Sequence, residues 1–208
     1  PLADELSQRT SAPVYGFGPA SAGRSPAMQQ LVAQGMTGGG EGIDTEFTPD
    51  ITVADGDVIS GEGWNLEVLH TPGHLGNHIA LAFGDACFTA DHVMGWASSL
   101  VSPPDGDLTD FMASCRKLRA RDWRIFYPGH GAPITDPAGR PDWLIAHREA
   151  REAAIIDALR SGPARPGDLA ARIYTETPAA LLLAAERNVL AHLIDLMGKS
   201  RVAPVGDL

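Results

Sequence analysis

Three short motifs of this 208-residue chain carry side chains that can bind metal ions. They are LHTPGHLGNH at residues 69–78, TADH at residues 89–92 and YPGHGAP at residues 127–133. Imidazole nitrogen and carboxylate oxygen are ligands of zinc and iron, and one carboxylate can bridge two divalent ions. A glycine beside each of the two histidines allows an abrupt loop and a close approach of the backbone. His74, Asp91 and His130 are therefore candidate metal ligands.

Each motif lies beside segments with the pattern of a β-strand. These segments are WNLEVLH at 64–70, HIALAF at 78–83, ACFTA at 86–90 and RIFY at 124–127. The Gly84-Asp85 pair between the second and third segments predicts a hairpin. Residues 108–118 have apolar side chains at helical spacing, and Asp107 or Thr109 is the expected N-cap. The candidate ligands are thus expected at strand ends.

The rest of the chain gives less specific patterns. We expect a helix at 2–10, a buried strand at 14–17, a flexible Gly-rich loop at 20–42 and two strand pieces within 51–59. We also expect a helix from about residue 142 to 159, two further helices within 164–174 and 181–200, and a terminal strand or wing at 201–205. No internal repeat is evident.

Composition restricts the class of protein. The apolar fraction of 44% fits a globular domain, and the net charge of −10 argues against a globally basic nucleic-acid surface. Residues 1–146 hold 18 acidic against 8 basic side chains, whereas residues 147–208 hold 8 of each. Cys87 and Cys115 are expected as buried free thiols. We find no apolar run approaching the ~18 residues of a membrane helix and no N-terminal signal, so we expect a cytoplasmic protein without a membrane partner.

The order of the motifs resembles the metallo-beta-lactamase superfamily. The strand-end TPGH, the aspartate of TAD, a helix, and a strand running into PGHG follow one another at about that family's spacing across residues 1–146. The resemblance implies that His74 binds a first metal ion, Asp91 bridges two ions and His130 binds the second. It also implies two divalent ions, with zinc first and manganese or iron as alternatives, and a hydrolase that uses a metal-bridging hydroxide.

One family motif is absent. No His-x-His pair occurs anywhere in the chain, so the H-x-H-x-D-H motif that opens the family's metal site is missing. The resemblance therefore implies an N-terminally truncated fragment that lacks its first strands. With His74, Asp91 and His130 alone, each ion would have fewer than the ~4 ligands of a tight zinc site. We expect such a fragment to be inactive or nearly so.

A second resemblance covers the C-terminal part. The segment ADHVMGWASSLVSPPDGDLTDFMASCRKL, followed by PGHG and HREARE, is similar to the beta-lactamase-like protein 2 branch, whose members end in a winged-helix module. The resemblance implies an α+β fold, with a truncated αββα sandwich at residues 1–146 and a winged-helix domain at residues 147–208. We expect this tail to cover the substrate groove by packing either on the catalytic domain or on a second subunit. In the second case the protein would be a homodimer.

Other residues have a functional and a structural interpretation. His78 is a candidate catalytic residue that contacts substrate or orients a ligand, and its alternative is a packed histidine at a strand start. His92 and Trp96 are candidates for the substrate pocket, against buried packing and an apolar loop anchor. The structural interpretation is favoured for His70, His147, His192 and Tyr127. Arg116, Lys117, Arg119, Arg121 and Arg124 form a basic cluster that is either a solvated face or a phosphate-binding patch.

Three functions compete. The first is a metal-dependent hydrolase whose substrate is either single-stranded RNA or a small acyl or thioester compound. The second is a glyoxalase II-like thioesterase. The third is a non-enzymatic nucleic-acid-binding protein that uses the winged helix, against which the neutral charge of the tail argues.

Overall fold

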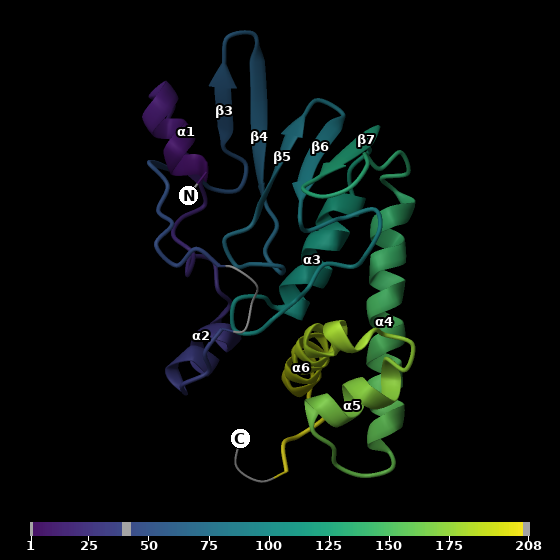
Figure 1. The fold of residues 1–208 in the computed structure, drawn as a ribbon. Coiled ribbons are helices and arrows are strands. Elements are labelled where there is room, and N and C mark those ends of the chain that lie inside the picture. The colour runs from purple at the N-terminus through teal and green to yellow at the C-terminus, as the bar shows by residue number, and fades with distance from the viewer. Residues whose placement is uncertain (1, 39–42, 206–208) are drawn as a thin grey trace.

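The computed structural model of the protein describes residues 2–38 and 43–205 (Figure 1). The helices are α1 (Leu2–Thr10), α2 (Pro26–Ala33), α3 (Leu108–Arg119), α4 (Gly139–Leu159), α5 (Pro166–Ile173), the 3-10 helix η1 (Ala179–Leu181) and α6 (Leu182–Gly198). The strands are β1 (Tyr15–Gly16), β2 (Ile51–Thr52), β3 (Val58–Gly61), β4 (Trp64–His70), β5 (Ile79–Phe83), β6 (Ala86–Ala90) and β7 (Ile125–Pro128).

The main sheet has five strands in the order β3-β4-β5-β6-β7. Neighbouring strands are antiparallel except β6 and β7, which are parallel. Strands β4, β6 and β7 therefore run in the same direction, and their carboxyl ends lie at the same end of the sheet. This topology brings together the three loops that carry His74, Asp91 and His130, because each loop begins where one of these strands ends.

One face of the sheet packs against helix α3. The side chains that alternate toward this face are buried, and they contact the apolar side of α3 in one core cluster. The cluster includes Leu69, Ala80, Ala82, Cys87, Phe126, Phe111, Cys115 and Leu118. Asp107 caps the helix by accepting hydrogen bonds from the backbone N–H groups of Thr109 and Asp110. The expected hairpin, helix and cap are thus confirmed, and both cysteines are buried and free.

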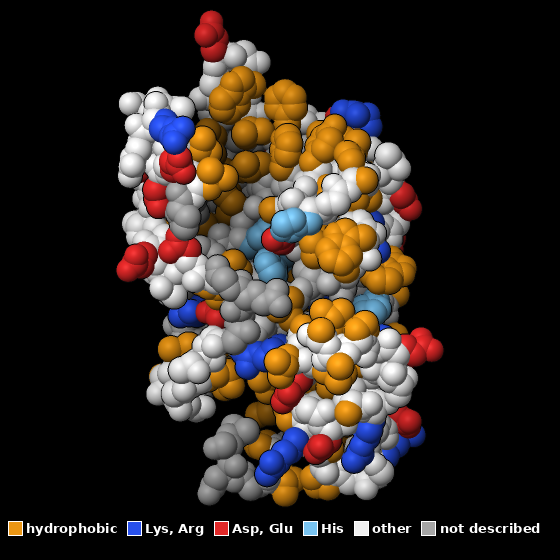
Figure 2. All heavy atoms as spheres, in the orientation of Figure 1, with side chains coloured by type: hydrophobic (Ala, Val, Ile, Leu, Met, Phe, Trp, Pro, Cys, Tyr) orange, Lys and Arg blue, Asp and Glu red, His pale blue; other side chains and the backbone are white. Residues whose placement is uncertain are grey.

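The opposite face of the sheet is largely uncovered. Trp64, Phe83, Phe88 and Tyr127 point away from α3 and expose 43%, 50%, 44% and 36% of their surface. Figure 2 shows hydrophobic side chains gathered over this part of the sheet. Besides this sheet, the described residues contain one two-stranded parallel sheet of β1 and β2. The α+β class is confirmed, with one well-formed five-stranded sheet.

Several local predictions need correction. The loop expected at residues 20–42 is interrupted, because Ser25 caps α2 and Pro26 stands at its first turn. This pair is a common helix start that the surrounding glycines obscured. Residues 39–42 of that segment lie outside the described residues. The strand expected at 14–17 is confined to Tyr15–Gly16, and the pieces within 51–59 join different sheets.

The C-terminal segment forms a second core around α5 and α6. Its buried members are Ile155, Leu169, Ala170, Ala185, Val189 and Leu196. Helix α4 begins at residue 139 and continues across the boundary expected at 146/147, so one helix joins the two parts (Figure 1). Residues 201–205 contain no strand, so the expected wing strand is not formed there. Within the described ranges, no helix combines the length and apolarity needed to span a bilayer.

Candidate functional site

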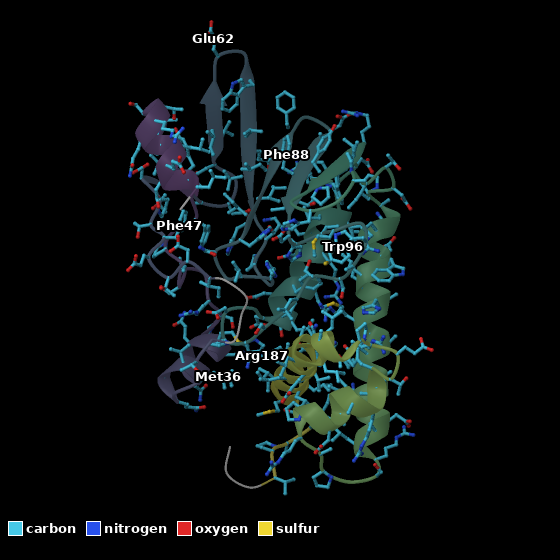
Figure 3. The ribbon with its side chains drawn as sticks, in the orientation of Figure 1. Met36, Phe47, Glu62, Phe88, Trp96 and Arg187 are labelled. Carbon is cyan, nitrogen blue, oxygen red and sulfur yellow. The ribbon has the colours of Figure 1, made fainter. Side chains whose placement is uncertain are left out.

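A cavity of about 730 Å³ opens where β4, β6 and β7 end. His74, Asp91 and His130 all line it, together with Phe47 and Trp96. Figure 2 shows imidazole and carboxylate side chains side by side in this hollow, and Figure 3 shows Phe47 and Trp96 on opposite sides of it. The volume is within the range of about 300–1,000 Å³ that is typical of small-molecule sites. The three candidate ligands therefore share one pocket.

The orientation of His74 is fixed by the loop that follows Asp91. Its Nδ1–H donates a hydrogen bond to the backbone oxygen of Leu100 at 2.7 Å. The lone pair of the neutral imidazole then lies on Nε2, which is the nitrogen left for a metal ion. A carbonyl partner of this kind is the usual support of a metal-binding histidine.

Asp91 and His130 face each other across the ends of β6 and β7. The distance from His130 Nε2 to Asp91 Oδ1 is 3.7 Å. Gly129 makes this approach possible, since a Cβ atom at that position would lie 2.4 Å from Asp91 Oδ1. Ala90, directly before Asp91, has a φ of 43°, a left-handed conformation that is strained for alanine. Ser99 holds the next turn by donating to the backbone oxygens of Asp91 and His92.

The donors fit a metal ion by type but not by number. Two imidazoles and a carboxylate reach one cavity, yet residues 2–38 and 43–205 contain no group of three or more His, Cys, Asp or Glu side chains placed around one position. The chain also lacks the H-x-H-x-D-H motif. The pocket therefore provides part of a ligand set.

His78 and His92 lie behind the pocket in the core. The Nδ1 atom of His78 and the Thr71 hydroxyl form a hydrogen bond of 2.8 Å. Only 9% of the surface of His78 is exposed. Burial, followed by the nearby His74, lowers the pKa of His78 to about 3. His92 is fully buried, its ring centroid 4.5 Å from that of Phe111, and burial also lowers its pKa. His92 is not among the described residues that line the cavity, so its surroundings favour the packed interpretation, as do those of His78.

His70 and the basic cluster have structural surroundings. His70 stacks on Phe17 with ring centroids 3.7 Å apart. Each cation of the cluster is paired with an acidic side chain: Arg116 with Glu149, Lys117 with Asp55, Arg119 with Asp142, Arg121 with Glu67 and Arg124 with Asp85. This arrangement favours a solvated face over a phosphate patch.

Trp96 is 70% exposed at the rim of the cavity, and its role in substrate binding stays a prediction. Among the described residues that line the cavity there is no Lys or Arg, and the charged ones are Asp44, Asp91 and Asp105. The wall is otherwise mostly apolar, and Asp105 is paired with Arg24 at 2.6 Å.

The C-terminal part contributes residues that no motif indicated. Leu181, Ala184 and Asn188 line the same cavity from η1 and α6. The sequence suggested a tail that covers the groove, but only the packing of α6 shows which side chains reach it. No local signal distinguishes these three from other residues of an amphipathic helix.

Comparison with known proteins places these features in a family. A model of the metallo-beta-lactamase superfamily matches residues 3–130, and a model of the beta-lactamase associated winged helix domain matches residues 166–207. A beta-lactamase-like protein 2 homolog of Drosophila melanogaster is 36% identical over 153 residues, which are 70% of this chain and 51% of that protein. An atrochrysone carboxyl ACP thioesterase of Aspergillus fumigatus is 30% identical over 161 residues, covering 71% of this chain and 49% of that protein.

A solved structure agrees with the same assignment. The crystal structure of a metallo-beta-lactamase family protein from Thermus thermophilus is 28% identical, with a TM-score of 0.67, and the match covers 75% of this chain and 52% of that one. The chain spans about half the length of the curated relatives it matches. On this evidence the chain belongs to the metallo-beta-lactamase superfamily and carries the beta-lactamase associated winged helix domain in its C-terminal part.

Proposed function

We propose that this chain forms part of a metal-dependent hydrolase that cleaves small esters or thioesters of carboxylic acids. The observation that carries the proposal is the convergence of His74, Asp91 and His130 on one apolar cavity. Superfamily membership supports hydrolysis as the class of reaction. The similarity to a protein named as a thioesterase supports the acyl substrate.

The residues present have distinct roles in this proposal. His74 Nε2, the Asp91 carboxylate and His130 would hold two divalent ions, zinc first, with further ligands that these three do not supply. Bound ions of this kind provide a water nucleophile that is active near neutral pH and stabilise the developing oxyanion. The backbone oxygen of Leu100 orients His74, and Ser99 fixes the backbone that follows β6.

The charge of the cavity supports an acyl substrate over single-stranded RNA. Affinity for a polyanion depends on Lys and Arg side chains that neutralise phosphates. The described wall of the cavity has none, and the basic cluster on and just after α3 is already paired with acidic side chains. An uncharged acyl group instead gains from burial against apolar side chains such as Phe47 and Met94.

The test compares hydrolysis with metal content. The chain, alone and together with any coding sequence that precedes it in its gene, would be loaded with Zn²⁺ or Mn²⁺. It would then be assayed on S-acyl-N-acetylcysteamine thioesters and on a single-stranded oligoribonucleotide. We expect thioester hydrolysis that His74→Ala abolishes and that His147→Ala, outside the cavity, leaves unchanged. RNA cleavage without thioester cleavage would overturn the acyl substrate, and absence of bound metal from the longer form would overturn the hydrolase.

A further inference from the structure

The C-terminal helices form one wall of the candidate site. Leu181 ends η1, and Ala184 and Asn188 lie on the first two turns of α6. Their spacing of three and four residues places them on one side of the helix. All three line the cavity that also holds His74 and Asp91. The wall therefore belongs to the pocket although it comes from a separate part of the chain.

Hydrogen bonds fix this wall to the loop after Asp91. Asn188 Oδ1 accepts hydrogen bonds from the Val101 backbone N–H at 3.2 Å and from Arg148 Nη1 at 2.9 Å. Arg148 is almost fully buried and also donates from Nη2 to the Ser99 backbone oxygen at 2.5 Å. Ser99 is the residue whose hydroxyl holds the backbone of Asp91. A continuous set of contacts thus links α6 with the loop that carries a candidate ligand.

A second attachment lies one residue away on α6. Arg187 donates from Nε to the Ser102 hydroxyl at 2.9 Å and from a guanidinium nitrogen to the Pro103 backbone oxygen (Figure 3). Further along α6, Asp195 Oδ1 accepts a hydrogen bond from the Thr109 hydroxyl of α3 at 2.7 Å. Because α6 is attached at several points, its cavity-facing side chains hold a defined position and can discriminate between ligands by size.

The side chains of this wall indicate the chemical class of ligand that it would accept. Ala184 and Leu181 are apolar, and the polar atoms of Asn188 are engaged by protein partners, including the Ala184 backbone oxygen. An apolar wall with a small residue at its centre accepts an alkyl or aryl group. Each methylene buried against such a wall raises affinity about fourfold.

We propose that Leu181 and Ala184 determine which acyl groups the pocket accepts, with Ala184 leaving room for the longer ones. Asn188 is a positioning residue that holds this wall against the loop of residues 99–101. The proposal rests on the proposed acyl substrate, and it assigns to the C-terminal module a part in substrate choice.

The test measures binding separately from hydrolysis. Non-hydrolysable thioether analogues of N-acetylcysteamine, with ethyl, hexyl and decyl groups, would be titrated into the intact chain by calorimetry. We expect affinity to rise with chain length in the wild type. Ala184→Leu should weaken decyl binding at least about tenfold and leave ethyl binding unchanged. Leu181→Ala should weaken hexyl binding about tenfold through lost contact.

Two variants outside the cavity serve as matched controls. Ala153→Leu makes the same change as Ala184→Leu at an exposed position of α4, and Leu183→Ala removes a leucine that is 75% exposed. Both should bind all three analogues like the wild type. Equal loss for every chain length in Ala184→Leu, or equal effects of Ala184→Leu and Ala153→Leu, would overturn the proposed wall. Normal length-dependent binding without thioester hydrolysis would instead overturn only the proposed function.

Discussion

His74 and His78 stand four residues apart in one loop, yet they have opposite surroundings. His74 donates to the Leu100 backbone oxygen and lines the cavity, whereas His78 is buried against Thr71 with its Nε2 atom unpaired. Their ring centroids are 6.4 Å apart. Access to the cavity, rather than a place in a histidine-rich motif, therefore decides whether a free imidazole nitrogen can reach a ligand: His74 lines the cavity, whereas the unpaired Nε2 of His78 is enclosed in the core.

The largest effect should come from the glycine that allows this loop. Gly73 has a φ of 138°, and a Cβ atom there would lie 2.3 Å from the Cα atom of Phe111. We expect Gly73→Ala to lower the free energy of unfolding by about 3 kcal/mol or more, from backbone strain and overpacking together. Chemical denaturation measures it. Gly84→Ala, at a φ of 57° with open space around it, should cost about 1 kcal/mol. Equal losses in the two variants would contradict the packing of Gly73 on α3.

The buried histidine behind the pocket should affect stability more than ligand binding. His92 fills core space beside Phe111 and Cys115. His92→Ala should lower the free energy of unfolding by about 2–4 kcal/mol through the cavity it leaves. Binding of the decyl thioether by the folded variant should stay within about twofold of the wild type. A stability loss below about 0.5 kcal/mol would show that His92 is not a core residue.

The burial of His78 should make the stability of the chain depend on pH. The pKa of His78 is lowered to about 3 in the folded chain, chiefly by burial and then by His74. Between this value and the ordinary pKa, the unfolded chain binds a proton on His78 and the folded chain does not. The contribution of His78 to the free energy of unfolding is therefore complete above its ordinary pKa of about 6.5, and it is lost as the pH falls from there toward 3.

Metal-free wild type should therefore lose up to about 1.4 kcal/mol per pH unit from this group between pH 6 and pH 4. His78→Gln should remove that part of the slope, with His70, His74 and His92 as the neighbouring titratable groups. Unfolding curves at fixed ionic strength measure the difference. A variant slope identical to that of the wild type would mean that His78 is not held neutral.

The smallest effect on stability is expected at the rim. Trp96 exposes 70% of its surface, so Trp96→Ala should change the free energy of unfolding by less than about 0.5 kcal/mol. If it contacts ligand, the same variant weakens binding of the decyl thioether several-fold. Loss of stability without loss of binding would identify Trp96 as a loop anchor instead.

The parts predicted from sequence are those set by local pattern. The β5-β6 hairpin follows from alternating apolar residues around Gly84-Asp85, and α3 follows from its apolar spacing and the Asp107 cap. The meeting of His74, Asp91 and His130 could be anticipated because strand-end loops carry all three. Their assignment to separate metal ions came from the family resemblance alone.

The parts that sequence did not reveal depend on contacts between distant segments. The neighbours of His92 come from α3, so no pattern around TADH distinguishes a pocket residue from a core residue. Likewise, Ala184 and Asn188 reach the cavity from α6, which Arg148 and Arg187 attach to the loop after β6. Long-range packing of this kind leaves no local signal.

We expect His74 to bind a metal ion and His78 not to bind one. The most direct measurement is the Zn²⁺ affinity of metal-free protein by calorimetry, in the longest form that the gene encodes, for the wild type, His74→Ala and His78→Gln. We predict at least tenfold weaker binding for His74→Ala and a change within about twofold for His78→Gln. Wild-type affinity in His74→Ala, or equal weakening in both variants, would show that His74 is not the metal ligand of this loop.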